Sequence, residues 1–345
     1  MKIMKCIRPK YFSKFQCDGK ICGSRCCKGW RVVVDNNTFE KYNNIADLSE
    51  RQEILSKLER IDDNNFIVKM KEDWTCPFLD KDYLCKIQKR HGENYLTNIC
   101  HSYPRVNYKI GEVLEQSLTL TCPVAARLIL LSEEPLKFEE IEIEEPRGIF
   151  NWTEKIKLPV EEAVQIQATA VSILQDRNFS LNERLLRLCI FFNGDINLEH
   201  KFDINEYAKI MIDIFCEMYG TEMNEQKKIN LRTIYITYSD IILSRLMENY
   251  SYIFENYLVN EFFMRCYPYA FEGDLWQNCK IFIIGYKAME FAIILTAISK
   301  NGFVTSDEFL NMIDAINEKL DHNRGGMRTI RELSERITNF TEKFF

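Results

Sequence analysis

The stretch CDGKICGSRCC, from Cys17 to Cys27, places four cysteines within eleven residues. Thiolate sulfur is a soft, charged donor that binds zinc and iron strongly, and close spacing lets one loop supply several ligands. A tetrahedral zinc site or an iron–sulfur cubane each uses about four such donors. The stretch therefore predicts that the first part of the chain folds around a metal centre.

Four more cysteines extend this pattern. They lie in Cys76-Pro-Phe-Leu-Asp, in Tyr-Leu-Cys85, in Cys100-His-Ser-Tyr-Pro-Arg and in Cys122-Pro. The candidate metal ligands are Cys17, Cys22, Cys26, Cys27, Cys76, Cys85, Cys100 and Cys122. Eight cysteines are enough for two closed sites, or for one site plus buried or redox thiols. Spacing alone leaves that choice open, and it does not separate iron from zinc.

The other five of the 13 cysteines have a different setting. Cys6 precedes the cluster, and four lie on apolar faces of expected helices, namely Cys189, Cys216, Cys266 and Cys279. Cysteine also behaves as a small buried hydrophobe, so we expect these five in the core, and the same alternative stays open for Cys122. We expect His101, beside Cys100, to support a thiolate rather than to coordinate the metal.

Length and composition favour a globular protein with two domains. The chain has 345 residues, of which 46% are hydrophobic and 28% charged, enough to bury a large core without disulfides. Residues 1–130 carry 22 Lys and Arg against 16 Asp and Glu, whereas residues 131–345 carry 23 against 35. A mildly acidic chain lacks the dense basic face that nucleic acid requires. The acidic second half would instead attract a basic protein segment.

Neither a secretory signal nor a membrane span is expected. Residues 1–15 are basic but lack an apolar segment. The longest apolar stretch, residues 282–298, is interrupted by Lys287 and Glu290, whereas a span needs about 20 nearly uncharged residues. We therefore expect a buried helix, no membrane partner and a cytoplasmic location. Many cysteines in a cytoplasmic chain indicate metal or redox chemistry rather than structural disulfides.

The first 159 residues divide into two expected parts. Residues 1–130 are expected to form an irregular, cysteine-rich metal-binding domain. Within it, a strand-like run, a turn and a helical stretch are expected at residues 30–34, 35–37 and 48–60. Residues 131–159 hold three prolines, with seven glutamates between Glu133 and Glu145, and are predicted to be an acidic linker. Residues 138–143 of this linker have the alternation of an edge strand with one polar face.

The remainder, residues 160–345, is predicted to be an all-helical bundle, which makes the fold class mainly α. Apolar residues recur at helical spacing over residues 160–175. Ser180 with Glu183 and Thr305 with Glu308 form capping-box patterns ahead of apolar runs. Further helices are expected over residues 204–219, 226–250, 252–265, 275–299 and 328–343.

Several nucleotide and hydrolase motifs are absent from the sequence. It contains no G-x-G-x-x-G, no P-loop, no G-x-S-x-G elbow and no H-E-x-x-H. Only 13 glycines are present, so loops that cradle phosphates are scarce. The sequence therefore predicts neither a usual dinucleotide site nor an ATP site.

The motifs together resemble a known family. The runs Cys22-Gly-Ser-Arg-Cys26-Cys27, Cys76-Pro-Phe-Leu, Leu84-Cys85-Lys-Ile and Cys100-x-x-Tyr103-Pro104-Arg105 resemble a cysteine-cluster domain described as zinc- or iron-chelating. A longer similarity, nearly end to end, is to the bacterial flagellin lysine N-methylase family. It adds Phe15-x-Cys17, Cys26-Cys27-x-x-Trp30 and the run from Glu255 to Asn260, Glu-Asn-Tyr-Leu-Val-Asn.

This resemblance implies transfer of a methyl group from S-adenosylmethionine to surface lysines of flagellin. It also implies an iron–sulfur cluster, of the 4Fe-4S type, rather than zinc. The sequence lacks the glycine-rich loop of Rossmann methyltransferases. It also lacks the C-x3-C-x2-C triplet of radical enzymes, because Gly29 stands where the third cysteine would be. The resemblance therefore implies an S-adenosylmethionine site built in another way.

Lysine methylation sets requirements for the site. A lysine ammonium has no free lone pair, so the enzyme must deprotonate it, which favours a desolvated, acidic or tyrosine-lined channel. Aromatic faces would help to hold the sulfonium and the methylated amine. The residues expected to serve are Tyr103, Tyr257 and Glu261 in catalysis and Arg105, Asn256 and Asn260 in cofactor binding, with Trp30 and Tyr108 near the cysteines. Capping and core packing is the alternative for those between Asn256 and Glu261, and thiolate neutralisation is the alternative for Arg105.

Two other functional classes remain open from the sequence. A non-enzymatic interaction module stabilised by zinc would be colourless, hold stoichiometric zinc and show no turnover. A redox or metal-handling protein would bind its metal reversibly and show a reversible potential.

Overall fold

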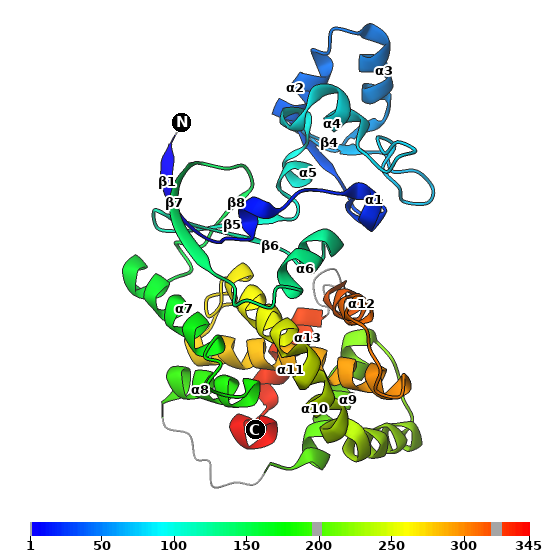
Figure 1. Cartoon of the computed structure of the whole chain (residues 1–345). Coiled ribbons are helices and arrows are strands. Elements are labelled where there is room, and N and C mark those ends of the chain that lie inside the picture. Colours follow the sequence, from blue (N-terminus) through cyan, green and yellow to red (C-terminus); the bar gives the residue numbers. More distant parts are fainter. Residues whose placement is uncertain (1, 195–201, 319–325) are drawn as a thin grey trace. The chain divides into compact units, whose positions relative to one another are not determined.

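The computed structural model describes residues 2–194, 202–318 and 326–345, which form two compact units (Figure 1). The first unit comprises residues 1–125 and 139–151, and the helical unit comprises residues 126–138 and 152–345. This division differs from the expected linker at residues 131–159. The middle of that segment belongs to the first unit because its two strands pair with a sheet there.

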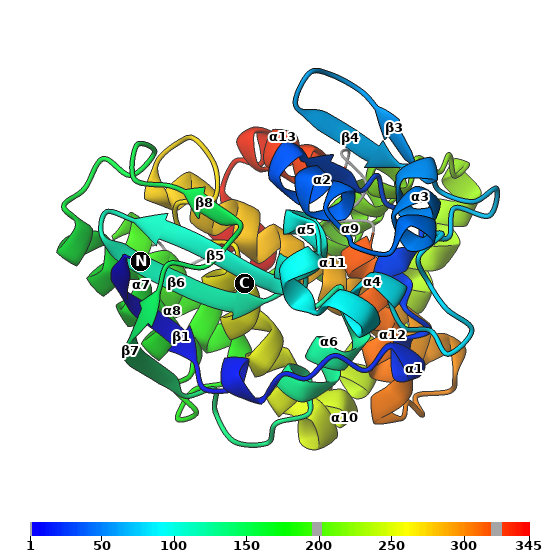
Figure 2. The same ribbon diagram turned by 90° about the horizontal axis from the view of Figure 1, so that it is seen from above.

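A five-stranded sheet forms one part of the first unit, in the order β7-β1-β6-β5-β8 (Figure 2). Its strands are β1 (Ile3–Pro9), β5 (Arg105–Ile110), β6 (Val113–Leu118), β7 (Phe138–Glu144) and β8 (Ile149–Asn151). The expected edge strand is confirmed as β7. Its Ile141 and Ile143 pack on the buried Cys6 and Leu114, while the alternating glutamates stay outside that core. This is the usual pattern for a sheet with one covered face.

A three-stranded sheet with short helices forms the other part of the first unit. Its strands are β2 (Val33–Asp35), β4 (Asn65–Val68) and β3 (Leu58–Arg60), in that order, and its helices are α1 (Gly19–Cys22), α2 (Asn36–Asn43), α3 (Leu48–Ser56), α4 (Lys86–His91) and α5 (Asn98–Ser102). The expected turn at residues 35–37 is the start of α2 instead, because the Asp35 carboxylate accepts the Thr38 backbone N–H at 3.0 Å. The first unit therefore contains two sheets and several short helices, whereas the sequence predicted an irregular domain.

The helical unit confirms the mainly α prediction. Its helices are α7 (Val160–Leu174), α8 (Leu181–Asn193), α9 (Ile204–Tyr219), α10 (Glu225–Met264), α11 (Leu275–Ser299), α12 (Ser306–Asn317), α13 (Gly326–Arg336) and α14 (Phe340–Phe344), and α6 (Pro123–Leu130) straddles the boundary between the units. Both predicted capping boxes form, at Ser180 and at Thr305. The break expected between the helices over residues 226–250 and 252–265 is present within α10 as a kink at Tyr250, whose backbone is not helical, with a φ of −137°.

The central helix of this unit is α11, which contacts α8, α9, α10, α12 and α13. It is long and apolar enough to cross a membrane by length and composition, with a mean hydropathy of 1.9 in its most apolar window. However, 83% of that window is buried inside the structure. This burial agrees with the predicted core helix, which carries Lys287 and Glu290 into the interior.

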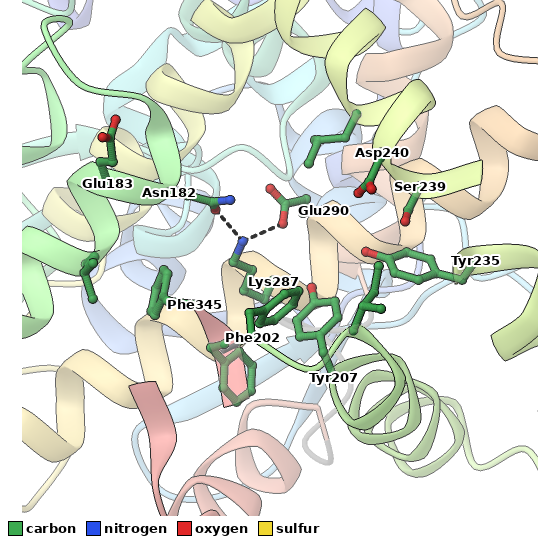
Figure 3. Close-up of a pocket in the computed structure, with 14 residues that line it drawn as sticks. Asn182, Glu183, Phe202, Tyr207, Tyr235, Ser239, Asp240, Lys287, Glu290 and Phe345 are labelled. Carbon is green, nitrogen blue, oxygen red and sulfur yellow. Dashed lines mark hydrogen bonds and ion pairs between the residues drawn. The ribbon is translucent and has the colours of Figure 1, made fainter. Parts of the chain in front are cut away.

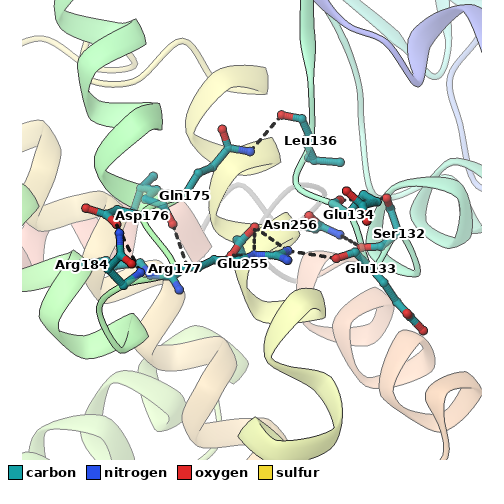
Figure 4. Close-up of polar contacts among 12 residues, drawn as sticks. Ser132, Glu133, Glu134, Leu136, Gln175, Asp176, Arg177, Arg184, Glu255 and Asn256 are labelled. Atoms are coloured by element: carbon teal, nitrogen blue, oxygen red, sulfur yellow. Dashed lines mark hydrogen bonds and ion pairs between the residues drawn. The ribbon is translucent and has the colours of Figure 1, made fainter.

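A buried charge network anchors the second half of α10 (Figure 4). The Glu255 carboxylate, which is 2% exposed, accepts hydrogen bonds from Arg177 Nε at 2.9 Å and from Arg184 Nη1 at 2.8 Å. Next to it, Asn256 Nδ2 donates to the carbonyl oxygens of Ile129 and Ser132 at 3.1 and 2.7 Å. These two side chains join α10 to the loop after α7 and to the end of α6.

Candidate functional site

All eight predicted metal ligands line one cavity of about 430 Å³ in the first unit, which we call the cysteine cavity. They reach it from the segment around α1, from the loop between β4 and α4, from α5 and from the residue before α6. The residues are Cys17, Cys22, Cys26, Cys27, Cys76, Cys85, Cys100 and Cys122. Positions up to 105 residues apart in sequence thus share one cavity, as cysteines serving one function would.

Backbone pairing holds the two main cysteine segments together. The Cys76 N–H donates to the Cys27 carbonyl oxygen at 2.8 Å, and Lys28 forms a β-bridge with Thr75. The second segment folds back on itself because the Asp80 carboxylate accepts the Leu84 N–H at 2.9 Å. The local fold therefore presents Cys26 and Cys27 beside the hairpin that carries Cys76 and Cys85.

Gly19 lies where α1 meets this hairpin. A Cβ at Gly19 would overlap the Tyr83 carbonyl oxygen and would come within 2.8 Å of Ser24 Oγ, a hydroxyl that also donates to that carbonyl. Because the obstacle is backbone, Gly19→Ala is expected to push the two segments apart and to destabilise the first unit by about 1–3 kcal/mol. Metal content and thermal melting of purified Gly19→Ala would measure this.

The neighbouring Lys20 is exposed, so Lys20→Ala is the matched control and should keep both the metal and the melting temperature of the parent chain. If Gly19→Ala behaves like Lys20→Ala, the close approach of α1 to Tyr83 is not required for the cavity.

Burial raises the pKa of most thiols in the cavity. The pKa of Cys76 rises to about 11, that of Cys122 to about 11 and that of Cys100 to about 12. Cys26 differs, because a hydrogen bond with Cys27 lowers the pKa of Cys26 to about 7 and raises that of Cys27. Most of these thiols are therefore protonated at neutral pH, and a bound metal would displace their protons.

The predicted residues Tyr103 and Arg105 also line this cavity. The Tyr103 ring packs edge-on against Trp30, with centroids 5.6 Å apart. Burial raises the pKa of Cys17, and the positive charge of Arg105 partly opposes that effect. Arg105 also lies over the Phe15 ring, 5.4 Å from its centroid. These contacts support the interpretation of Arg105 as a neutralising charge.

The other two predicted groups near the cysteines have separate settings. His101 lines the cavity, and burial together with the Arg147 charge lowers its pKa, so its ring is neutral at pH 7. Tyr108 packs its ring against Phe150 on β8, at 5.8 Å, and does not line the cavity.

The donor set fits a thiolate-ligated cofactor in kind and number. Among residues 2–194, 202–318 and 326–345, however, no group of three or more His, Cys, Asp or Glu side chains is placed so that it could hold one metal ion. The structure therefore shows eight thiols that share one cavity.

The predicted residues on α10 lie in the other unit, and the side chains of Asn256, Tyr257 and Glu261 contact residues outside the predicted set. The Tyr257 hydroxyl donates to Asn317 Oδ1 at 3.2 Å, and Arg265 Nε donates to Glu261 Oε2 at 2.6 Å. Tyr257 and Glu261 border a cavity of about 20 Å³, which has room for about one water molecule. Asn260 is buried at 1% exposure. This setting supports the alternative of capping and packing.

Of the five cysteines expected in the core, Cys6, Cys189, Cys266 and Cys279 are fully buried, whereas Cys216 on α9 is half-buried. None of the five lines the cysteine cavity. The division of the cysteines into two sets by sequence spacing therefore agrees with their placement.

A second cavity, of about 260 Å³, lies within the helical unit and is called the helical pocket (Figure 3). Its polar lining consists of Asn182, Glu183, Tyr207, Tyr235, Ser239, Asp240, Lys287 and Glu290. Sequence reasoning missed this site. The signal for it was the pair Lys287 and Glu290, one helical turn apart inside an apolar run, which served only as an argument against a membrane span.

Comparison with known proteins points to the helical unit. Residues 195–343 match the profile of the FliB lysine N-methylase C-terminal domain. A lysine-N-methylase of Salmonella typhimurium strain LT2 is 31% identical over 144 residues, which cover 41% of this chain and 36% of that protein. The flagellar biosynthetic protein FliU of Salmonella muenchen is 31% identical over 144 residues, which cover 41% of this chain and 85% of that protein. The chain belongs to the FliB lysine N-methylase family.

Membership in the FliB lysine N-methylase family confirms the resemblance, although the matched part is shorter than the nearly end-to-end similarity expected. The aligned region spans only 36% of the length of the Salmonella typhimurium lysine-N-methylase. No solved structure matches the chain. Because the profile match begins at residue 195, the cysteine cavity lies outside it and is supported by its own geometry.

Proposed function

We propose that this protein is an S-adenosylmethionine-dependent protein lysine N-methyltransferase that acts on flagellin and carries an iron–sulfur centre in the cysteine cavity. Its membership in the FliB lysine N-methylase family is the observation that carries the proposal. The FliU name connects one relative with the flagellum. With this substrate and cofactor, we propose a cytoplasmic location for the enzyme.

The shared cavity supports an iron–sulfur cluster over a single zinc ion. In a cubane each cysteine binds a different iron atom, so the thiolates surround the cofactor and need not converge on one point. Cys26, Cys76 and Cys85 act on the pKa of Cys100 and also on that of Cys27, so these five thiols lie near one another. We propose that the cluster ligands come from this group.

The remaining cavity cysteines form a second group. Cys22 and Cys26 act on the pKa values of both Cys17 and Cys122, so Cys17, Cys22 and Cys122 also lie near Cys26. Burial of the negatively charged cluster would be balanced in part by Arg105, which is close enough to Cys17 to lower its pKa. The cysteines of the cavity would thus hold the cluster, and Arg105 would offset part of its negative charge.

Methyl transfer requires a neutral lysine amine beside the donor. S-adenosylmethionine supplies an activated methyl group on a sulfonium, and the protein must bind and desolvate the lysine and remove its proton. Aromatic rings and carboxylates suit that task. Such groups line the helical pocket, whereas Tyr257 and Glu261 on α10 contact Asn317 and Arg265.

Intact-mass analysis of flagellin co-expressed with this protein tests the proposal. We expect a series of flagellin masses separated by about 14 Da, one step for each methyl group added. No such series should appear when the protein is omitted. Purified protein should also be brown and contain iron. A folded, metal-loaded protein that leaves the flagellin mass unchanged would contradict the enzyme assignment and favour a binding module.

A further inference from the structure

The helical pocket combines a buried polar floor with an exposed rim. Asn182, Glu183, Phe202 and Asp240 at the rim are exposed, whereas Tyr207, Tyr235, Ser239, Lys287 and Glu290 are buried. Figure 3 shows the Tyr207 and Tyr235 hydroxyls directed toward the Lys287–Glu290 pair. A ligand group that entered from the surface would therefore reach polar atoms only at the bottom.

Ser239 supplies the observation that points to a ligand. Its side chain belongs to a residue that is 3% exposed, and Ser239 Oγ has no hydrogen-bond partner among the described residues. A buried hydroxyl without a partner costs about 1–3 kcal/mol, so such atoms are uncommon in native interiors. Because Ser239 lines the pocket, a bound polar group would satisfy it.

The charges of the pocket select a cation or an amine over an anion. The carboxylates of Asp240 and Glu290 line it against the ammonium of Lys287, while the Glu183 carboxylate is held by Ser180 in the capping box of α8. That ammonium already donates to Asn182 Oδ1 at 2.7 Å and to Glu290 Oε2 at 2.8 Å. An anionic ligand would therefore meet net negative charge and a cation that is already neutralised.

The same buried pair also acts on the protonation of an incoming amine. Glu290 is held in place by both Lys287 and the Tyr286 hydroxyl, the latter at 3.1 Å, and would attract a cation to the pocket. The fixed Lys287 ammonium and the desolvated floor oppose a second positive charge. The pocket is thus suited to an amine that arrives as a cation and is held in neutral form by hydroxyl groups.

Size and wall chemistry narrow the ligand further. A cavity of about 260 Å³ lies just below the roughly 300–1,000 Å³ of pockets that enclose drug-sized ligands, a size that suits a single long side chain. The walls carry the apolar side chains Leu186, Leu243 and Ile204 and the rings of Phe202, Phe344 and Phe345. Such a lining matches an aliphatic stem that ends in an amine.

We propose that the helical pocket binds the side chain of a lysine, with its methylene stem between the apolar walls and its amine beside Ser239, Tyr207 and Tyr235. The assignment deepens the proposed function and rests on it, because the floor residues Tyr207, Tyr235, Ser239, Lys287 and Glu290 lie within the part of the chain matched to the family. Lys287 and Glu290 are positioning residues here, since they set the charge of the floor.

Calorimetric titration of the full-length, metal-containing protein tests the assignment. The probe is Nα-acetyl-lysine N-methylamide, and Nα-acetyl-norleucine N-methylamide, which lacks the amine, is the control ligand. We expect saturable binding of the lysine probe only. Ser239→Ala should weaken it about threefold to tenfold through loss of one hydrogen bond, and Glu222→Gln, on the exposed surface, should leave it unchanged.

Lys287→Met/Glu290→Gln removes both buried charges together and so avoids leaving one of them unpaired. We expect this double variant to weaken binding of the lysine probe more than tenfold. Equal binding of the norleucine probe would overturn the assignment, as would an unchanged Kd in a folded Ser239→Ala. Competition by S-adenosylhomocysteine would also overturn it, because the pocket would then hold the methyl donor.

The binding readout needs no turnover, so it separates this inference from the proposed function. Lysine binding without modification of flagellin would defeat the proposed function alone. Methylated flagellin with no effect of Ser239→Ala on probe binding would defeat the pocket assignment alone.

Discussion

Replacing Glu255 with alanine should destabilise the helical unit by about 3–5 kcal/mol, the cost of breaking a buried ion pair from one side. Arg184, 6% exposed, would lose the carboxylate that it contacts at 2.8 Å. Its guanidinium would be left buried with only carbonyl oxygens, those of Phe179 and Leu174, as partners. Arg177 would lose its contacts with the same carboxylate. Urea unfolding followed by circular dichroism at 222 nm, roughly the helical minimum of such bundles, would measure the change.

Two further variants isolate the role of the charge. Glu332→Ala removes an exposed carboxylate that pairs with Arg328 one helical turn away, and it should have little effect because exposed pairs contribute little. Glu255→Gln keeps the shape of the side chain but removes its charge. Its free energy of unfolding should lie between those of Glu255→Ala and Glu332→Ala. If Glu255→Ala and Glu332→Ala unfold at the same urea concentration, the network in Figure 4 does not stabilise the fold.

Replacing Cys100 or Cys26 with alanine is expected to abolish metal binding and to leave the protein poorly soluble. Both side chains line the cysteine cavity, and Cys26 is the thiol that acts on the pKa of both cysteine groups. Metal binding and folding are coupled in domains whose ligands come from separate loops. Iron and zinc analysis, the visible absorption spectrum and thermal melting would follow the loss.

Cys216→Ala provides the matched control, since this half-buried cysteine on α9 lies in the helical unit. It should retain the metal and the spectrum of the parent chain. Full metal content and normal melting in both Cys26→Ala and Cys100→Ala would contradict a single centre that uses these ligands.

Local signals predicted the helical unit well. The capping boxes at Ser180 and Thr305 formed as expected, because such a box involves only residues three apart. The ends of α9 and α11 also agree with the expected ranges, since apolar periodicity is read along one element. The expected helix over residues 328–343 was interrupted, with Asn339 at a φ of 51°, a break that apolar periodicity does not reveal.

Long-range pairing explains the larger differences. The glutamate-rich segment after residue 131 resembled a linker in composition, yet β7 and β8 within it join a sheet whose other strands lie at residues 3–9 and 105–118. Whether an edge strand pairs depends on its partner, which local composition does not specify. Asn256 was a candidate for cofactor binding, but its amide contacts Ile129 and Ser132, which are distant in sequence.

The sequence by itself determined the set of eight candidate cysteines, the boundaries of most long helices and the resemblance to the family. These depend on residue type and on spacing along one segment. Only the tertiary structure decided that eight cysteines share one cavity and that side chains of α8, α9, α10 and α11 enclose a pocket around Lys287. The physical reason is that a site is formed by contacts between segments that are distant in sequence. Those contacts exist only in the folded chain.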